Sequence, residues 1–199
     1  MRKDQDSNSI FIFSLLFPGL GFLAVISKAW NKSYHKIILL FAFWFGFFVY
    51  LNDTKNGDIV RYKVAFATTS SYSWSDYFYL VGHTFSEDKL IVYNETVVNS
   101  KPDFYALSVQ FFVSRFTDNF RWFFGFISFF YTLFFLKFLY EARLLAGHKQ
   151  HRIWRLVFGT LMVIVPFYVG VTGIRFWTAL FLFMWFLLKF IRTKNLLYL

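Results

Sequence analysis

The sequence predicts an all-α integral membrane protein that forms a single membrane domain over residues 1–199. It has about five transmembrane helices, and a long, partly helical extracytoplasmic region lies between spans two and three. Of its 199 residues, 57% are hydrophobic, 26% are aromatic and only 16% are charged. That charged fraction is too small for the exterior of a soluble domain. Long apolar runs recur along the chain, and Lys and Arg collect in the short segments between them, as in cytoplasmic loops.

The formal net charge of +10 does not indicate a nucleic-acid partner. Nucleic-acid binders place basic residues along one polar helix or among exposed aromatics, and this chain does neither. We therefore expect membrane lipid, not nucleic acid, as the surroundings. The chain has no cysteine, which excludes disulfides, thiolate metal sites and a cysteine nucleophile. Because metal and nucleotide motifs are also missing from the sequence, we expect no metal and no cofactor.

The first predicted span covers residues 10–26 and is interrupted by Pro18 and Gly19. Its length just reaches across a hydrocarbon layer of about 30 Å, and the proline predicts a kink in this helix. A cleaved signal peptide is the alternative interpretation. Asp4 and Asp6 argue against that alternative, because they lie where a signal peptide carries positive charge.

The second predicted span covers residues 37–51, and a polar region over residues 52–118 follows it. This region holds eight of the eleven acidic residues of the chain: Asp53, Asp58, Asp76, Glu87, Asp88, Glu95, Asp103 and Asp118. Pro102 suits the first turn of a helix that runs to about Phe116. The polar residues of this helix fall near one face, which favours a helix in the membrane interface or packed over the bundle. A short ordinary membrane helix is the alternative.

The remaining predicted spans cover residues 120–140, 153–170 and 174–190. Three segments are rich in Lys and Arg: 28–36, 141–155 and 189–194. With five spans, all three basic segments fall on the same side of the membrane, and the positive-inside rule makes that side the cytoplasm. The N-terminus, the 52–118 region and the turn before the last span then face outward.

Arg175 is the first candidate for a functional residue. It lies at the outer end of two predicted spans, on the side where the charge rule disfavours arginine. A buried arginine without a partner costs several kcal/mol, so this position needs a partner or a ligand. One interpretation is a guanidinium that binds a phosphate through two parallel hydrogen bonds. The other is an anchor whose charged end reaches the lipid headgroups.

Asp58, Arg61 and Tyr62 follow soon after the second predicted span. An aspartate three residues before an arginine can pair with it on one helical turn, which is a structural role. Asp58 can alternatively serve as a general base at the mouth of an outward cavity. The spacing is compatible with both interpretations.

The order of several short motifs resembles one known family. The segment 58–66 reads Asp-x-x-Arg-Tyr-x-x-x-Phe, the segment 101–105 reads Lys-Pro-Asp-Phe-Tyr, and Gly-Ile-Arg at 173–175 begins the last span. Together with the basic loops between spans, this order resembles the EpsG-type family of bacterial polysaccharide polymerases, relatives of the Wzy O-antigen polymerases. The resemblance covers residues from about 10 to 195.

This resemblance implies a multi-pass protein of the bacterial inner (cytoplasmic) membrane that acts in exopolysaccharide biosynthesis. Such a glycosyltransferase would polymerise oligosaccharides carried on undecaprenyl pyrophosphate at the outer face of the membrane. Arg175 would hold the pyrophosphate, and Asp58 or Asp103 would bind or deprotonate the acceptor sugar. Arg61 and Tyr62 would shape the site.

The chain departs from this family in its length, because the family's members are usually much longer. The sequence is therefore expected to be the N-terminal half of a polymerase or a shorter relative. A non-catalytic membrane subunit, or an assembly protein that binds other membrane subunits, is the alternative function.

Overall fold

The computed structural model describes residues 2–28, 31–48, 58–84, 91–93, 96–98, 104–146, 174–195 and 197. The chain divides into two compact units. Unit 1 combines Met1–Tyr50 with Phe124–Leu199, and unit 2 is Leu51–Phe123. Helix dominates the described residues of both units, and unit 2 nearly coincides with the predicted outer region 52–118.

Unit 1 begins with two short helices where the sequence predicted one kinked helix. These are α1 (Arg2–Leu16) and α2 (Pro18–Val25), and a short 3-10 turn, η1 (Ile26–Lys28), follows them. The chain leaves the helical conformation at Phe17, which has φ −130° and ψ 70°. Pro18 explains the break, because its ring disfavours a helical conformation at the preceding residue and it is well suited to the first position of a new helix.

Three long helices complete the described part of unit 1: α3 (Lys32–Phe48), α7 (Arg121–Ala146) and α10 (Ile174–Thr193). They occupy the second, third and fifth predicted spans, with ends shifted by several residues. The fourth predicted span, 153–170, lies outside the described residues. In the described part of the chain, α7 and most of α10 are long and apolar enough to cross a membrane. At 1.5 Å per residue, the 26 residues of α7 extend over about 39 Å.

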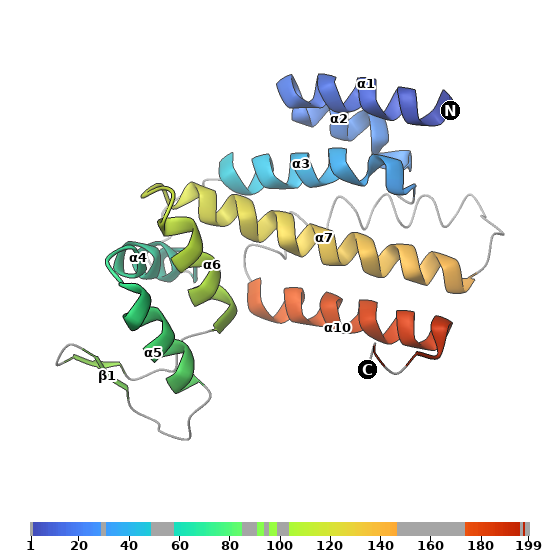
Figure 1. Ribbon diagram of the computed structural model, residues 1–199. Coiled ribbons are helices and arrows are strands. Elements are labelled where there is room, and N and C mark those ends of the chain that lie inside the picture. The colour runs from blue at the N-terminus through green and yellow to red at the C-terminus, as the bar shows by residue number, and fades with distance from the viewer. Residues whose placement is uncertain are drawn as a thin grey trace. The chain divides into compact units, whose positions relative to one another are not determined.

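The helices α3 and α7 run in opposite directions, as Figure 1 shows. The ring of His35 lies 6.5 Å from that of Tyr140, and the ring of Phe43 lies 5.4 Å from that of Phe126. A residue early in α3 therefore contacts the end of α7, and a late residue contacts its start. This is the arrangement expected of two successive membrane spans.

The helices α7 and α10 run in the same direction (Figure 1). The ring of Tyr131 packs on Phe181 at 5.6 Å, and that of Phe134 packs on Trp185 at 6.3 Å. Further along both helices, Arg192 Nε donates a hydrogen bond of 2.7 Å to Glu141. Because α10 is parallel to α7, the chain between them returns to the end of unit 1 from which α7 started.

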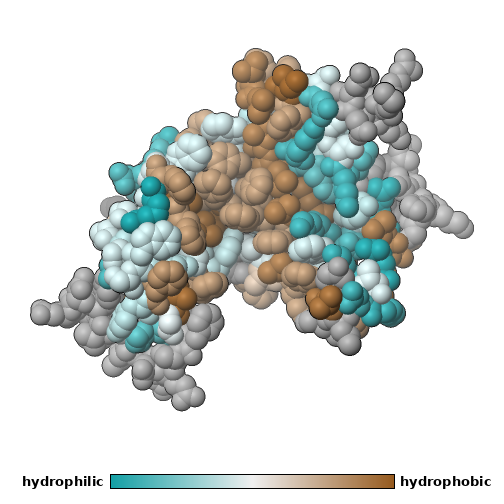
Figure 2. Space-filling model, viewed as in Figure 1, coloured by the Kyte–Doolittle hydropathy of each residue, from teal (hydrophilic) through white to brown (hydrophobic). Residues whose placement is uncertain are grey.

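Most of the described basic residues of unit 1 gather at one end, with Arg175 as an exception. Lys32, at the start of α3, lies 4.2 Å above the ring of Tyr140, near the end of α7. Arg192, at the end of α10, pairs there with Glu141. Figure 2 shows this hydrophilic end beside a hydrophobic band over the helix sides. The sequence prediction that the basic segments share one side agrees with this geometry.

The described residues of unit 2 form three helices and one hairpin: α4 (Asp58–Ser70), α5 (Trp74–Thr84), β1 (Ile91–Tyr93), β2 (Thr96–Val98) and α6 (Phe104–Ser114). The two strands are antiparallel, with Ile91 opposite Val98. The sequence analysis did not predict this hairpin. The core of unit 2 joins α5 to α6 through Tyr77, Leu80, Leu107 and Phe111.

Candidate functional site

The helix α4 holds three of the predicted site residues. Asp58 is its first residue, and its side chain lies outside the described residues. Arg61 is exposed to solvent one turn later. Tyr62 is half-buried, and its ring packs at 6.0 Å against Phe123. Tyr62 therefore fixes the position of α4, and Arg61 lies on the exposed face of this helix.

The helices α4 and α6 pack against each other. The side chain of Gln110 donates a hydrogen bond of 3.3 Å to the carbonyl of Tyr62, and Arg115 donates one of 2.7 Å to the carbonyl of Ser70. Side chains from α6 and from the turn after it therefore hold α4 at two points along its length. Asp103 lies outside the described residues, and α6 begins at the next residue.

The polar residues of α6 point inward, which the sequence analysis did not predict. Gln110 and Ser114 are 3% and 9% exposed, whereas Phe104 and Phe112 are 46% and 47% exposed. The polar face of α6 thus packs on α4, where Gln110 finds a backbone carbonyl, and part of the apolar face is open. Of the predicted placements, packing over other helices fits better than a polar face turned to water.

Arg175 belongs to unit 1, apart from the other predicted site residues. It is the second residue of α10, and its side chain lies outside the described residues. Within unit 1 it occupies the end of α10 opposite to Arg192 and the basic cluster. The outward placement of this end stays a prediction. The structure thus joins Arg61 and Tyr62 on α4 and keeps Arg175 on a separate element.

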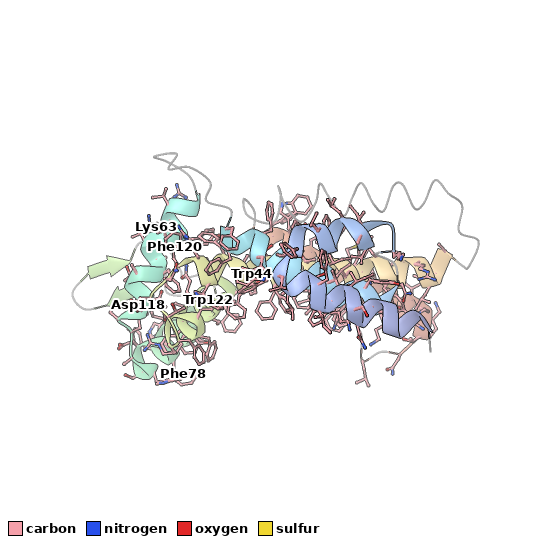
Figure 3. The ribbon with its side chains drawn as sticks, turned by 90° about the horizontal axis from the view of Figure 1, so that it is seen from above. Trp44, Lys63, Phe78, Asp118, Phe120 and Trp122 are labelled. Atoms are coloured by element: carbon pink, nitrogen blue, oxygen red, sulfur yellow. The ribbon has the colours of Figure 1, made fainter. Side chains whose placement is uncertain are left out.

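Lys63 adds a cation next to the predicted residues, although the sequence analysis did not select it. Its Nζ lies 5.0 Å from the centre of the Phe120 ring, and Figure 3 shows the two side chains side by side. A cation above an aromatic face is attracted by the negative potential of the ring. The only signal in the sequence was the position of Lys63 directly after Arg61 and Tyr62.

Unit 2 also presents aromatic side chains to solvent. Trp74 and Phe78 of α5 are 52% and 63% exposed, and the Trp74 ring lies 6.0 Å from that of the exposed Phe112 on α6. We call Trp74, Phe78 and Phe112 the aromatic surface. Single exposed apolar residues are common, but a contiguous group indicates a surface for binding. In the sequence, this surface could have been predicted from the four-residue spacing of Trp74 and Phe78, which places both side chains on one face of a helix.

Tyr72 of unit 2 has a pKa that is changed by its surroundings. Burial raises the pKa of Tyr72 above its ordinary value, and the negative charge of Asp76 raises it further. Tyr72 is therefore a neutral hydrogen-bonding group at physiological pH, not a base. Among the described residues, no group of three or more His, Asp or Glu side chains could hold a metal ion.

Comparisons with known proteins do not assign the chain to a family. No family model matches it, and neither a curated protein nor a solved structure is significantly similar. Within the described residues, the fold shows a mainly helical protein with two helices that could cross a membrane.

Proposed function

We propose that the protein is a multi-pass protein of the bacterial cytoplasmic membrane, with unit 1 in the bilayer and unit 2 on the outer side. Four spans are α3, α7, the segment 153–170 and α10, and the first apolar run is a fifth membrane-inserted segment. This arrangement is supported by the basic residues that gather at one end of unit 1, because positive loops are retained in the cytoplasm.

The sides of the helices support the same proposal. Phe176 and Phe183 of α10 are 65% and 61% exposed in unit 1, although both are large apolar side chains. In water this exposure is unfavourable, at roughly 25 cal/mol per Å² of apolar surface. In a bilayer the same surface contacts lipid tails at no such cost.

Single-cysteine reporters test this topology, because the chain has no native cysteine. Ser75→Cys on unit 2 and Asn195→Cys after α10 both lie at exposed positions. The reporters are expressed in cells whose outer membrane has been removed and whose cytoplasmic membrane is intact. A membrane-impermeant maleimide should label Ser75→Cys in these cells. It should label Asn195→Cys only after the cytoplasmic membrane has been permeabilised. The protein should also stay in the membrane pellet after alkaline carbonate. Equal labelling of both reporters, or release by carbonate, would contradict the topology.

The biochemical function that we propose is glycosyl transfer in surface polysaccharide synthesis, on oligosaccharides linked to undecaprenyl pyrophosphate. One structural observation supports it most. The motif residue Asp58 begins α4, the motif residue Asp103 directly precedes α6 in the sequence, and these two helices pack against each other in unit 2. An exposed Arg61 on the first turn of α4 adds positive charge there.

In this mechanism the acceptor hydroxyl attacks the anomeric carbon of the donor sugar. Asp58 takes the hydroxyl proton as a general base, and Asp103 holds the acceptor. The bond between the anomeric carbon and the pyrophosphate oxygen breaks, and its electron pair leaves with undecaprenyl pyrophosphate. The guanidinium of Arg175 stabilises the developing charge through parallel hydrogen bonds. Arg61 and Tyr62 shape the site around the sugars.

The test uses purified protein in proteoliposomes with a lipid-pyrophosphate oligosaccharide, and product length is read on a gel. Asp58→Asn and Arg175→Ala should each reduce polymer formation by about 100-fold or more, since removing a general base or a charge-stabilising group costs that much. Thr68→Ala, on an exposed position of the same helix α4, is the matched control and should retain activity. Full activity of both site variants would exclude the proposed mechanism.

A non-catalytic role as a membrane subunit is the second candidate, and the aromatic surface favours it. Exposed Trp and Phe side chains are typical anchors of protein interfaces. In this case Trp74→Ala and Phe78→Ala should abolish co-purification of another membrane protein while Asp58→Asn has no effect. The opposite pattern, loss of polymer in Asp58→Asn alone, would support the glycosyltransferase.

A further inference from the structure

The helices α1 and α2 fold back on each other as a tight hairpin. A Cβ atom added at Gly21 of α2 would lie only 3.1 Å from Cα of Ser14 in α1. In one continuous helix, residues seven positions apart are separated by about 10 Å. The chain therefore reverses between them, at Phe17. Gly21 allows this close approach, because it has no side chain.

Both ends of this hairpin lie at the basic end of unit 1. Ser7 Oγ, early in α1, donates a hydrogen bond of 2.5 Å to the carbonyl of Ser33 at the start of α3. One residue later, Asn8 accepts a hydrogen bond from Lys36 Nζ. At the other end of the hairpin, Lys28 Nζ lies 5.2 Å above the ring of Tyr34. The chain thus enters and leaves the hairpin beside the first turns of α3.

The tip of the hairpin is apolar and exposed. Its outward side chains are Leu15, Leu16, Phe17, Leu20 and Leu23, which are 51% to 76% exposed. All of them except Leu15 border a shallow apolar groove that Phe41 of α3 also lines. The eight residues of α2 extend over about 12 Å, less than half of the ~30 Å hydrocarbon layer. A hairpin of this depth reaches into one leaflet only.

Several polar groups near the turn of the hairpin are hydrogen-bonded within the chain, which lowers the cost of placing them in lipid. The N–H of Phe17 donates to the carbonyl of Phe13 at 3.0 Å, and the N–H of Gly21 donates to the carbonyl of Phe17 at 3.0 Å. The buried Ser14 hydroxyl donates to the carbonyl of Ile10 at 2.6 Å. Pro18 has no N–H that would need a partner.

We propose that α1 and α2 form a re-entrant hairpin, whose tip inserts among the acyl chains of the cytoplasmic leaflet and returns to the same side. The N-terminus then faces the cytoplasm, with Arg2 and Lys3 beside the other basic segments. This replaces the outward N-terminus that the sequence predicted. The inference rests on the membrane embedding in the proposed function, and it is independent of the glycosyltransferase activity.

Three single-cysteine variants test the side on which the N-terminus lies: Gln5→Cys, Asn31→Cys and Ser75→Cys. In intact cells the impermeant maleimide should label only Ser75→Cys, and permeabilisation should expose Gln5→Cys and Asn31→Cys together. Labelling of Gln5→Cys in intact cells, while Asn31→Cys stays protected, would overturn the hairpin and restore a membrane-crossing helix. If Asn31→Cys and Ser75→Cys are labelled equally in intact cells, α3 does not cross the membrane. That result would contradict both the proposed topology and the re-entrant hairpin.

A cross-link tests the hairpin without reference to the membrane. Asn8→Cys paired with Lys36→Cys should be joined within one chain by a short bismaleimide, because the native side chains contact each other. In a crossing arrangement these residues would lie on opposite sides, and the cross-link would not form. Its absence in the folded protein would therefore overturn the hairpin, whatever the labelling result.

Two glycines provide matched variants for the turn. A Cβ at Gly21 would lie 2.6 Å from Cβ of Ser14, whereas a Cβ at Gly19 meets only the Phe41 ring at 4.0 Å. In the paired-cysteine background, Gly21→Ala should lower the cross-linking rate about tenfold, since overpacking costs about 1–3 kcal/mol. Gly19→Ala should leave the rate unchanged. Equal rates in the two variants would contradict the tight hairpin.

Discussion

The pair of Glu141 and Arg192 is the clearest electrostatic contact at the basic end of unit 1. Glu141 is 6% exposed, and its carboxylate accepts hydrogen bonds of 2.7 and 3.4 Å from the Arg192 guanidinium. The sequence shows Glu141 only as a single acid before a basic loop. Its partner could not be identified from sequence, because the two residues are 51 positions apart.

Removal of this acid should destabilise unit 1. Glu141→Ala leaves Arg192 without its carboxylate, and we expect a loss of about 1–2 kcal/mol, below the value for fully buried pairs because the arginine is partly exposed. Thermal unfolding of the purified protein in detergent measures this loss of stability. The double variant Glu141→Ala/Arg192→Ala should lose less than the sum of the two single variants. Strict additivity would show that the contact contributes nothing.

Arg115 holds the C-terminal end of α4 in unit 2. Its guanidinium donates to the carbonyls of Thr69 and Ser70 at 3.4 and 2.7 Å, and it lies 4.6 Å from the Phe111 ring. A cation at a helix C-terminus is stabilising, since carbonyls there lack intrahelical partners.

Loss of this cap should loosen unit 2. Arg115→Ala should lower the stability of unit 2 by about 1 kcal/mol and increase its rate of limited proteolysis several-fold. Arg115→Lys retains the positive charge but not the planar guanidinium. Its stability and its rate of proteolysis should therefore lie between those of the wild type and of Arg115→Ala. Proteolysis of Arg115→Ala at the wild-type rate would mean that the contacts are not stabilising.

At the scale of elements, glycines set how closely the helices pack. A Cβ at Gly46 of α3 would lie 2.4 Å from the carbonyl oxygen of Phe124 in α7. Backbone atoms cannot move aside as a flexible side chain can. The close approach of α3 and α7 therefore requires a glycine at position 46.

Alanine at two glycines should have opposite effects. Gly46→Ala should destabilise unit 1 by about 1–3 kcal/mol, because the added methyl forces the helices apart. Gly82 of α5 has nothing within 4 Å of an added Cβ. Gly82→Ala should therefore be neutral or stabilising, by up to about 1 kcal/mol from helix propensity. Thermal unfolding compares the two, and a Gly46→Ala protein as stable as wild type would contradict the close packing.

The apolar runs made the long helices predictable from the sequence. The turns, and the contacts between elements, were harder to predict. Runs of Phe and Leu predicted α3, α7 and α10, because only helices of such composition suit a bilayer. The same reasoning treated Pro18 as a kink, although it reverses the chain. The hairpin of β1 and β2 was missed, although two short runs rich in β-branched residues, 91–93 and 96–98, are separated by only two residues in the sequence.

The candidate site was predictable only as a set of separate residues. The sequence selected Asp58, Arg61 and Tyr62 as neighbours, and α4 does place them within two turns. The packing of α4 on α6 depends on Gln110 and Arg115, which reach backbone carbonyls 48 and 45 residues earlier in the chain. Long-range contacts of this kind leave no local pattern, so the contact between α4 and α6 could not be derived from spacing.

At the scale of the whole molecule, the proposed topology makes charge the determinant of the orientation in the membrane. Lys28, Lys32 and Lys36 flank the first turns of α3 and should hold that end in the cytoplasm. Changing all three lysines to Gln should raise the fraction of molecules with inverted orientation. This fraction is measured as the share of Ser75→Cys that the impermeant maleimide does not label in intact cells. Changing Lys63, Arg115 and Arg121 of unit 2 to Gln should leave this fraction unchanged. Identical labelling in both triple variants would show that these lysines do not set the orientation.

The parallel pairing of α7 with α10 also has a consequence for the order of synthesis. Glu141 leaves the ribosome 51 residues before Arg192, a delay of about 3 to 10 seconds at usual elongation rates. In the proposed membrane topology the carboxylate has no Arg192 to neutralise it during that time, so the end of α7 would wait in the hydrated headgroup layer. The final position of α7 would then be set late, when α10 inserts beside it and brings the arginine.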